Sequence, residues 1–199
     1  MRVLGLTGSI GMGKSTTAKL FSEAGVPVYD ADATVHKIYE GEAAPVIEAA
    51  FPGTTVDGKV DREKLSARVV HDAAAMTRLE QIVHPMLHAY RQAFLDRAER
   101  WGADVAVVDV PLLFETGGEK HVDAVVVVTT TPAIQRERIL ARDNMTDDKL
   151  TTILARQLPD AEKRSRADLV VDTSHGIDHV RERIREILAQ AAKMPRRRP

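Results

Sequence analysis

The sequence predicts an α/β fold with a five-stranded parallel sheet covered by helices. Short apolar runs alternate with helical patterns along the 199 residues, as in parallel sheets whose strands are joined by helices. The runs at 105–109 and 123–130 consist largely of valine and alanine, which indicates strands buried on both faces. A glycine-rich loop at 8–15 separates the first strand from the first helix. At this length the chain forms one compact domain with room for an inserted subdomain.

The loop at 8–15 reads Gly-Ser-Ile-Gly-Met-Gly-Lys-Ser, which fits the P-loop spacing of glycine, four residues of any type, and Gly-Lys-Ser or Gly-Lys-Thr. An apolar strand at 3–6 precedes it and a helical stretch at 16–21 follows. This is the strand-loop-helix context that the motif needs, so a glycine-rich turn without a ligand is disfavoured. The expected fold is therefore a three-layer α/β/α P-loop NTPase that binds a nucleotide.

The residue types of the loop suit a phosphate that is bound at close range by backbone N–H groups. Gly8, Gly11 and Gly13 allow the chain to wrap the β-phosphate, and the helix that follows directs its N-terminal N–H groups and dipole at it. Lys14 is expected to reach the β- and γ-phosphates, and the Ser15 hydroxyl to bind Mg²⁺.

Composition limits the partners and the compartment. The net charge of −1 provides no broad positive field for a nucleic acid, and the basic tail at 196–198 is interpreted as a solvated end. The absence of cysteine excludes disulfides, thiolate nucleophiles and cysteine-bound metals. Neither a signal pattern nor an apolar run of membrane-spanning length is seen. We expect a soluble cytoplasmic protein.

A second strand is predicted at 26–29, and it ends at Asp30-Ala31-Asp32. Ligands of α/β proteins gather at the carboxyl ends of strands, so Asp32 is a candidate for chemistry. The alternative is that Asp32 caps a helix over 33–39, and spacing alone leaves the two roles open. His36 lies one turn further on, and by itself it is interpreted as a histidine on the helix surface.

Residues 42–101 are predicted to be mainly helical, apart from a weak strand at 54–60 that turns at Asp57-Gly58. Asp61 and Asp72 are expected to cap two of the helices. His84-Pro85 is expected to break the second of these, and a longer helix then runs to 101. In P-loop kinases, a helical block between the second and third strands forms the pocket for the phosphate acceptor.

The second half of the chain predicts three further strands and a basic lid. The strand at 105–109 ends at Asp109, which resembles a Walker B position that could hold Mg²⁺ through water. Thr131-Pro132 begins a helix that carries Arg136, Arg138 and Arg142. These arginines suggest a lid that contacts phosphate, and the alternative is an ordinary charged helical hairpin. Further elements are expected at 123–130, 147–157, 159–166, 167–172 and 177–192.

With these landmarks placed, the chain resembles the dephospho-CoA kinase family over nearly its full length. The resemblance is carried by 5–16, Asp30-Ala31-Asp32, His84-Pro85, 111–117, Arg142-Asp143, Gln157, Lys163-Arg164 and Ala167-Asp168. Two departures are mild, since Ser9 replaces a usual glycine and Met12 a usual small residue.

The resemblance implies transfer of the γ-phosphoryl group of ATP to the ribose 3′-hydroxyl of dephospho-CoA, the last step of coenzyme A synthesis. It also implies a P-loop core at 1–32, 103–131 and 167–192, a helical CoA-binding insertion at 33–102 and a lid at 132–166. Asp32 matches the family's acidic residue at the acceptor hydroxyl, which favours a role as base or orienting group over capping.

The expected site combines groups that act on the donor, the acceptor and the metal. Catalysis is assigned to Asp32, Lys14 and Arg142, and nucleotide binding to Thr7, Gly8, Gly11, Met12, Gly13, Lys14, Ser15 and Thr16. Acceptor binding is assigned to Asp32, His36, His84 and Leu112, and Mg²⁺ to Ser15 and Asp109. We expect a monomer that acts on a small molecule.

Two other functions are compatible with a P-loop. A kinase that acts on a nucleoside monophosphate shares the core and lid, but it needs an arginine-lined pocket for an acceptor phosphate, whereas the corner at 30–32 suits a neutral hydroxyl better. A nucleotide-dependent switch hydrolyses slowly and is recognised by a partner protein. The inserted helices and the arginine-bearing lid argue against such a switch.

Overall fold

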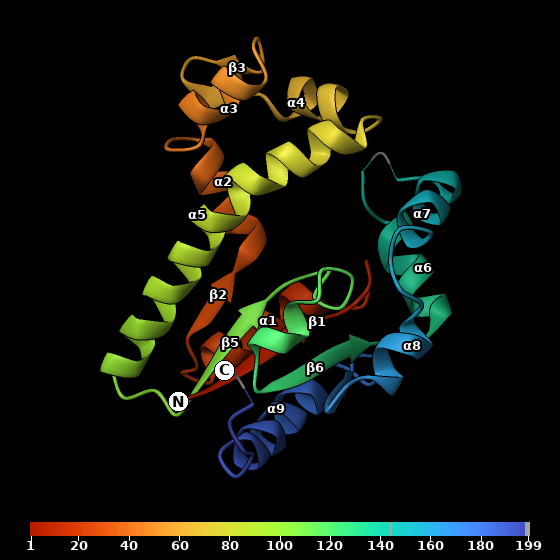
Figure 1. Ribbon diagram of the computed structural model, residues 1–199. Coiled ribbons are helices and arrows are strands. Elements are labelled where there is room, and N and C mark those ends of the chain that lie inside the picture. The colour runs from red at the N-terminus through yellow and green to blue at the C-terminus, as the bar shows by residue number, and fades with distance from the viewer. Residues whose placement is uncertain (144, 198–199) are drawn as a thin grey trace. The chain divides into compact units, whose positions relative to one another are not determined.

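The computed structural model describes residues 1–143 and 145–197, and the chain divides into two compact units (Figure 1). The first unit comprises the residues up to Tyr29 and those from Ala98 onward, and the second is Asp30–Arg97. Each unit has a hydrophobic core of its own.

The first unit is built on a five-stranded parallel sheet with the strand order β2-β5-β1-β6-β7. The strands are β1 (Arg2–Thr7), β2 (Val28–Asp30), β5 (Val105–Asp109), β6 (Ala124–Thr129) and β7 (Leu169–Asp172). Leu6 of β1 pairs with Asp109 on one side and with Val126 on the other. The chain therefore leaves β1 and β5 at the same edge of the sheet, and the loop predicted to bind phosphate lies at this edge.

Helices α1 (Lys14–Glu23) and α9 (Ile177–Ala191) pack on one face of this sheet. On the other side, a Cβ added at Gly5 would lie 2.7 Å from Leu113 Cδ2, so the segment that follows β5 packs directly on the β1 backbone. The remaining helices of the first unit are η1 (Gly118–His121), α6 (Pro132–Leu140), α7 (Asp147–Leu154) and α8 (Asp160–Ser165) (Figure 1). The predicted α/β class and parallel sheet are confirmed.

The C-terminal tail departs from the prediction of a solvated end. The Arg197 N–H donates to Asp123 Oδ1 at 2.9 Å, and its guanidinium donates to Asp168 Oδ1 at 2.6 Å. Arg2 Nε donates to the Met194 carbonyl at 2.5 Å. The tail is thus bonded to residues that precede or begin three strands. Arg198 of the predicted basic tail lies outside the described residues.

The second unit consists of helices and one short hairpin. Its elements are α2 (Ala31–Tyr39), α3 (Ala44–Ala50), β3 (Thr55–Val56), β4 (Lys59–Val60), α4 (Arg62–Val69) and most of α5 (Ala73–Arg100). The hairpin turns at Asp57 and Gly58, which have φ values of 50° and 74°, as the sequence predicts. Asp61 and Asp72 accept hydrogen bonds from N–H groups at the starts of α4 and α5, which confirms both caps.

The predicted helix break at His84-Pro85 is wrong, because α5 continues through Pro85. A proline inside a helix removes one hydrogen bond and costs about 3 kcal/mol. Side chains on both sides of Pro85 pack in the same core, Leu79 and Val83 before it and Leu87 and Tyr90 after it. Packing along this helix face offsets the free-energy cost of the proline. A prediction from the proline alone does not include this packing.

Candidate active site

Each of the three glycines in the loop at 8–15 is required for a structural reason. Gly11 and Gly13 have φ values of 80° and 93°, in the left-handed region that other residues rarely adopt. Gly8 has no such backbone, but a Cβ there would lie 2.7 Å from the Val128 carbonyl oxygen. We call the stretch 8–15 the cradle. Its shape requires three positions without a side chain.

The cradle leads directly into the first turn of α1. Gly13 is the N-cap residue and provides no side chain to bind the free N–H groups. The first hydrogen bond of the helix runs from Thr17 N–H to the Gly13 carbonyl at 3.0 Å, so the N–H groups of Lys14, Ser15 and Thr16 have no partner within the helix. The positive end of the helix dipole lies here as well. This arrangement suits an anion such as a phosphate.

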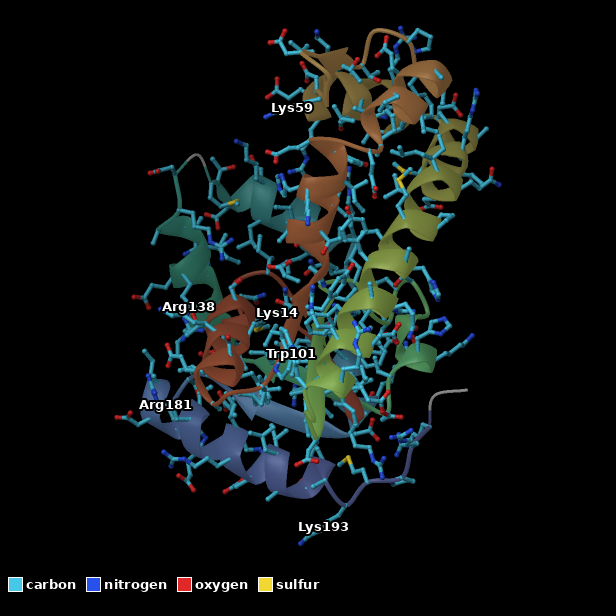
Figure 2. All side chains as sticks on the ribbon, turned by 90° about the vertical axis from the view of Figure 1, so that its left-hand side faces the viewer. Lys14, Lys59, Trp101, Arg138, Arg181 and Lys193 are labelled. Carbon is cyan, nitrogen blue, oxygen red and sulfur yellow. The ribbon has the colours of Figure 1, made fainter. Side chains whose placement is uncertain are left out.

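Lys14 is already paired in this structure. Its Nζ lies 2.5 Å from Asp109 Oδ1, at the last residue of β5. The Lys14 and Asp109 side chains are 16% and 5% exposed, so the pair is largely shielded from water. Figure 2 labels Lys14 at the start of α1. The ammonium group is therefore held beside the cradle by a buried carboxylate.

Two residues predicted to bind the nucleotide have buried side chains. Thr7 is fully buried and its hydroxyl donates to the Pro111 carbonyl at 3.0 Å. Met12 packs in the core of the first unit, and its carbonyl accepts a hydrogen bond from the Thr173 hydroxyl at 2.8 Å. These side chains fix the cradle from the inside. The Ser15 and Thr16 side chains are exposed.

The three arginines in and just after α6 have different surroundings. Arg136 pairs with Asp147, with Nη2 2.7 Å from Oδ2. Arg138 donates to the Thr173 hydroxyl at 2.8 Å and to the Thr173 carbonyl at 3.0 Å. Arg142 is exposed and, within residues 1–143 and 145–197, takes part in no ion pair. Arg142 is thus the one of the three whose guanidinium is available to a ligand in the described part of the chain.

In the second unit, the structure excludes the alternative that Asp32 caps the helix. Helix α2 begins at Ala31, and its cap is Asp30, whose Oδ1 accepts from Ala33 N–H at 2.9 Å. Asp30 can cap because its backbone is still extended, with φ −100° and ψ 112°. Asp32 lies in the first turn with its side chain exposed, and no hydrogen bond or ion pair binds it within the described residues.

The other predicted acceptor residues lie at the surface. The His36 Nε2 is 2.7 Å from Arg62 Nη1, and since arginine can only donate, Nε2 is the acceptor. His84 is exposed on α5. Leu112 belongs to the first unit, in the segment after β5, and is 40% exposed.

Three residues that support the cradle were not predicted to do so. Gln135 and Gln157 both bind Ile10, and Lys163 is fully buried in an ion pair with Glu115. Gln157 and Lys163 are among the residues that carry the family resemblance, but no local pattern indicates their partners. These contacts join segments more than 40 residues apart.

Two features are absent from the described residues. No helix among them is long and apolar enough to cross a membrane. Nor does the described part of the chain contain a group of three or more His, Cys, Asp or Glu side chains that could hold a metal ion by themselves.

The cradle lies at the carboxyl edge of a parallel sheet, leads into a helix and is faced by Lys14. These features define a P-loop nucleotide-binding protein. Comparison with known proteins narrows this class. The family model for dephospho-CoA kinase matches residues 2–179. A dephospho-CoA kinase of Nitrobacter winogradskyi is 83% identical over 198 residues and one of Rhodopseudomonas palustris is 80% identical over 199, each match covering 100% of both chains.

Two solved structures have a fold similar to that of this chain. A crystal structure of a protein from Thermus thermophilus has a TM-score of 0.84 at 31% identity, covering 95% of this chain and 97% of the other. A dephospho-CoA kinase from Campylobacter jejuni has the same fold, with a TM-score of 0.63 at 24% identity and coverage of 96% and 98%. The chain belongs to the dephospho-CoA kinase family. It is thus a member of a kinase family, whose enzymes use ATP.

Proposed function

We propose that this protein transfers the γ-phosphoryl group of ATP to the ribose 3′-hydroxyl of dephospho-CoA, giving coenzyme A and ADP, the final step of coenzyme A biosynthesis. The observation that carries the proposal is the family match over residues 2–179 in a chain whose cradle retains its left-handed glycines and its paired lysine. The protein is proposed to act in the cytoplasm as a monomer, on a small molecule rather than a nucleic acid.

On the donor side, the free N–H groups after Gly13 bind the β-phosphate, and Lys14 neutralises the charge that builds up on the transferred group. The transition state of phosphoryl transfer spreads negative charge over three oxygens, so catalysis is mainly positioning and cationic stabilisation. We propose that Lys14 exchanges its contact with Asp109 for a contact with the phosphates. The buried carboxylate thus keeps the ammonium in place until a nucleotide competes for it.

The donor side also fits Mg²⁺. The Ser15 hydroxyl and the Asp109 carboxylate are hard oxygen donors of the kind this ion prefers, and we propose that they hold it directly or through water. When bound there, this ion would supply positive charge beside the phosphates of ATP.

On the acceptor side, Asp32 is proposed to align the 3′-hydroxyl and to take its proton late in the transfer. Its support is the exposed carboxylate, which is not committed to capping because Asp30 performs that role. His36, His84 and Leu112 are proposed to contact dephospho-CoA, with 33–102 as the CoA-binding insertion. Arg142 stabilises the transferred group from the lid, residues 132–166, whose closure excludes water as a competing acceptor.

An acceptor panel tests this function. The purified protein is incubated with ATP and Mg²⁺ and, in turn, with dephospho-CoA, AMP, shikimate or no acceptor, and ADP is measured. We expect ADP only with dephospho-CoA, together with a product phosphorylated at the 3′ position. Turnover of AMP would indicate a nucleoside monophosphate kinase. Slow ADP formation that is independent of every acceptor would indicate a nucleotide-dependent switch.

A further inference from the structure

The tip of the cradle is held by two glutamines from the lid. Ile10 donates its N–H to Gln157 Oε1 at 3.1 Å, and its carbonyl accepts from Gln135 Nε2 at 2.7 Å. Gln135 lies on α6 and is buried, and Gln157 follows α7. The two peptide groups that flank Ile10 are therefore fixed by side chains 125 and 147 residues away in sequence.

Gln157 is itself held in place by a buried ion pair. The next residue, Leu158, donates its N–H to Glu115 Oε1 at 2.9 Å, and Lys163 Nζ lies 2.9 Å from the same oxygen. The Lys163 side chain is 0% exposed, so water does not compete for it. A chain of contacts thus runs from Lys163 through Glu115 to the backbone beside Gln157, and from Gln157 to Ile10.

Helix α6 packs tightly against the cradle at Gly11. A Cβ added at Gly11 would lie 2.6 Å from Ile139 Cδ1 and 3.0 Å from the Gln135 carbonyl oxygen. The same turn of α6 therefore packs on Gly11 with its backbone and bonds Ile10 with its side chain. The glutamines act on the residue directly before the part of the cradle that turns toward a phosphate.

We propose that Gln135 and Gln157 are positioning residues that hold the cradle in its phosphate-binding shape before the nucleotide arrives. The inference rests on the proposed ATP-dependent function and adds these two residues to it. A loop that is ordered in advance does not lose backbone entropy on binding, so its ligand binds more tightly. Because the glutamines belong to the lid, they also couple the position of the lid to the shape of the cradle.

The test compares ADP with AMP, which lacks the β-phosphate that the cradle surrounds. For Gln157→Ala and for Gln135→Ala, we expect the Kd of ADP, measured by titration calorimetry, to rise about fivefold to thirtyfold, as the ordering cost of one backbone residue predicts. The Kd of AMP is expected to change less than twofold. In kinetics, the KM for ATP should rise by a similar factor, with kcat within about threefold of the unmodified protein.

Gln190→Ala, on the exposed surface of α9, is the matched control and should leave both affinities unchanged. Gln157→Asn keeps the amide group but shortens the side chain, so it should weaken ADP binding as Gln157→Ala does. It provides the test if the alanine variant is too unstable to measure. Equal weakening of ADP and AMP, or ADP affinities within twofold of the unmodified protein, would overturn the inference. Failure of the unmodified protein to bind ADP would overturn the proposed function as well, and so the two failures are distinguishable.

Discussion

The predicted site residues of the two units differ in how firmly they are held. In the first unit, Lys14 is ion-paired, Gly11 is packed against α6, and Thr7 is buried and hydrogen-bonded. In the second unit, Asp32 and His84 are exposed, and within residues 1–143 and 145–197 their side chains have no hydrogen-bond partner. Lys14, Gly11 and Thr7 are thus ordered in advance, whereas Asp32 and His84 are left for a ligand to engage.

Because of this difference, substitutions in the two units should affect stability, nucleotide affinity and turnover differently. A change in the first unit removes contacts that exist without a ligand, so it should lower stability and nucleotide affinity together. A change at an exposed acceptor group removes nothing from the folded protein itself. It should lower turnover while stability and ATP affinity stay almost constant.

Lys14→Ala should give the largest loss on the donor side. We expect kcat to fall on the order of a hundredfold or more, because the charge directed at the transferred group is removed. The buried Asp109 carboxylate also loses its ion-pair partner, so the melting temperature should fall. Steady-state kinetics and thermal denaturation measure the two effects. Lys19→Ala, with its side chain 77% exposed on the same helix, is the control. Turnover within a few-fold of normal would remove Lys14 from this role.

Gly11→Ala should have a smaller but distinct effect. The new Cβ meets Ile139 and the α6 backbone at a φ of 80°, so we expect about 1–3 kcal/mol less stability and at least roughly tenfold weaker ADP binding. Urea denaturation and calorimetry measure these. Gly41→Ala in the second unit meets no atom within 4 Å and should change neither value. Equal behaviour of the two variants would contradict the contrast between the units.

Glu115→Gln should change stability in a pH-dependent way. Partial burial raises the pKa of Glu115, but hydrogen bonds from Lys163 and the Leu158 N–H outweigh it, so the pKa lies below its ordinary value of 4.5. A lowered pKa contributes stability that is present above about pH 4.5 and is lost as pH falls through the folded value. The variant should be less stable by about 3 kcal/mol at pH 7, since it leaves Lys163 buried without a charged partner.

The difference in unfolding free energy between Glu115→Gln and the unmodified protein should therefore stay constant from pH 7 to about pH 5 and narrow as the pH falls below about 4.5. Urea denaturation at several pH values measures this. Glu63→Gln, an exposed change on α4, is the control and should change the unfolding free energy at pH 7 by no more than about 0.5 kcal/mol. A difference that also stays constant below about pH 4.5 would mean that the carboxylate charge is not what stabilises the contact.

The features predicted correctly from the sequence are those with a local cause. The loop at 8–15 carries its own spacing, and the caps Asp61, Asp72 and Thr131 bond to N–H groups within three residues. The turn at Asp57-Gly58 likewise requires residues that tolerate positive φ. Short-range geometry decides these features, so residue type and spacing are sufficient to predict them.

The features missed depend on contacts distant in sequence or on a small backbone difference. Pro85 remains helical because core packing on both sides of it outweighs one lost hydrogen bond. Asp30 and Asp32 are the same residue type two positions apart, and only the extended backbone at Asp30 decides which one caps α2. The contact between Gln157 and Ile10 spans 147 residues, and no local pattern encodes it.

The most direct test of the account is Asp32→Asn, which keeps the size of the side chain and removes its charge. We predict that kcat with dephospho-CoA falls about a hundredfold or more, as for loss of a group that accepts the hydroxyl proton. The Kd of ATP should stay within about twofold of that of the unmodified protein, and the melting temperature within about 2 °C. The reason is that Asp32 supports neither the cradle nor the helix cap. Near-normal kcat, or a loss of ATP affinity as large as the loss of kcat, would contradict the account.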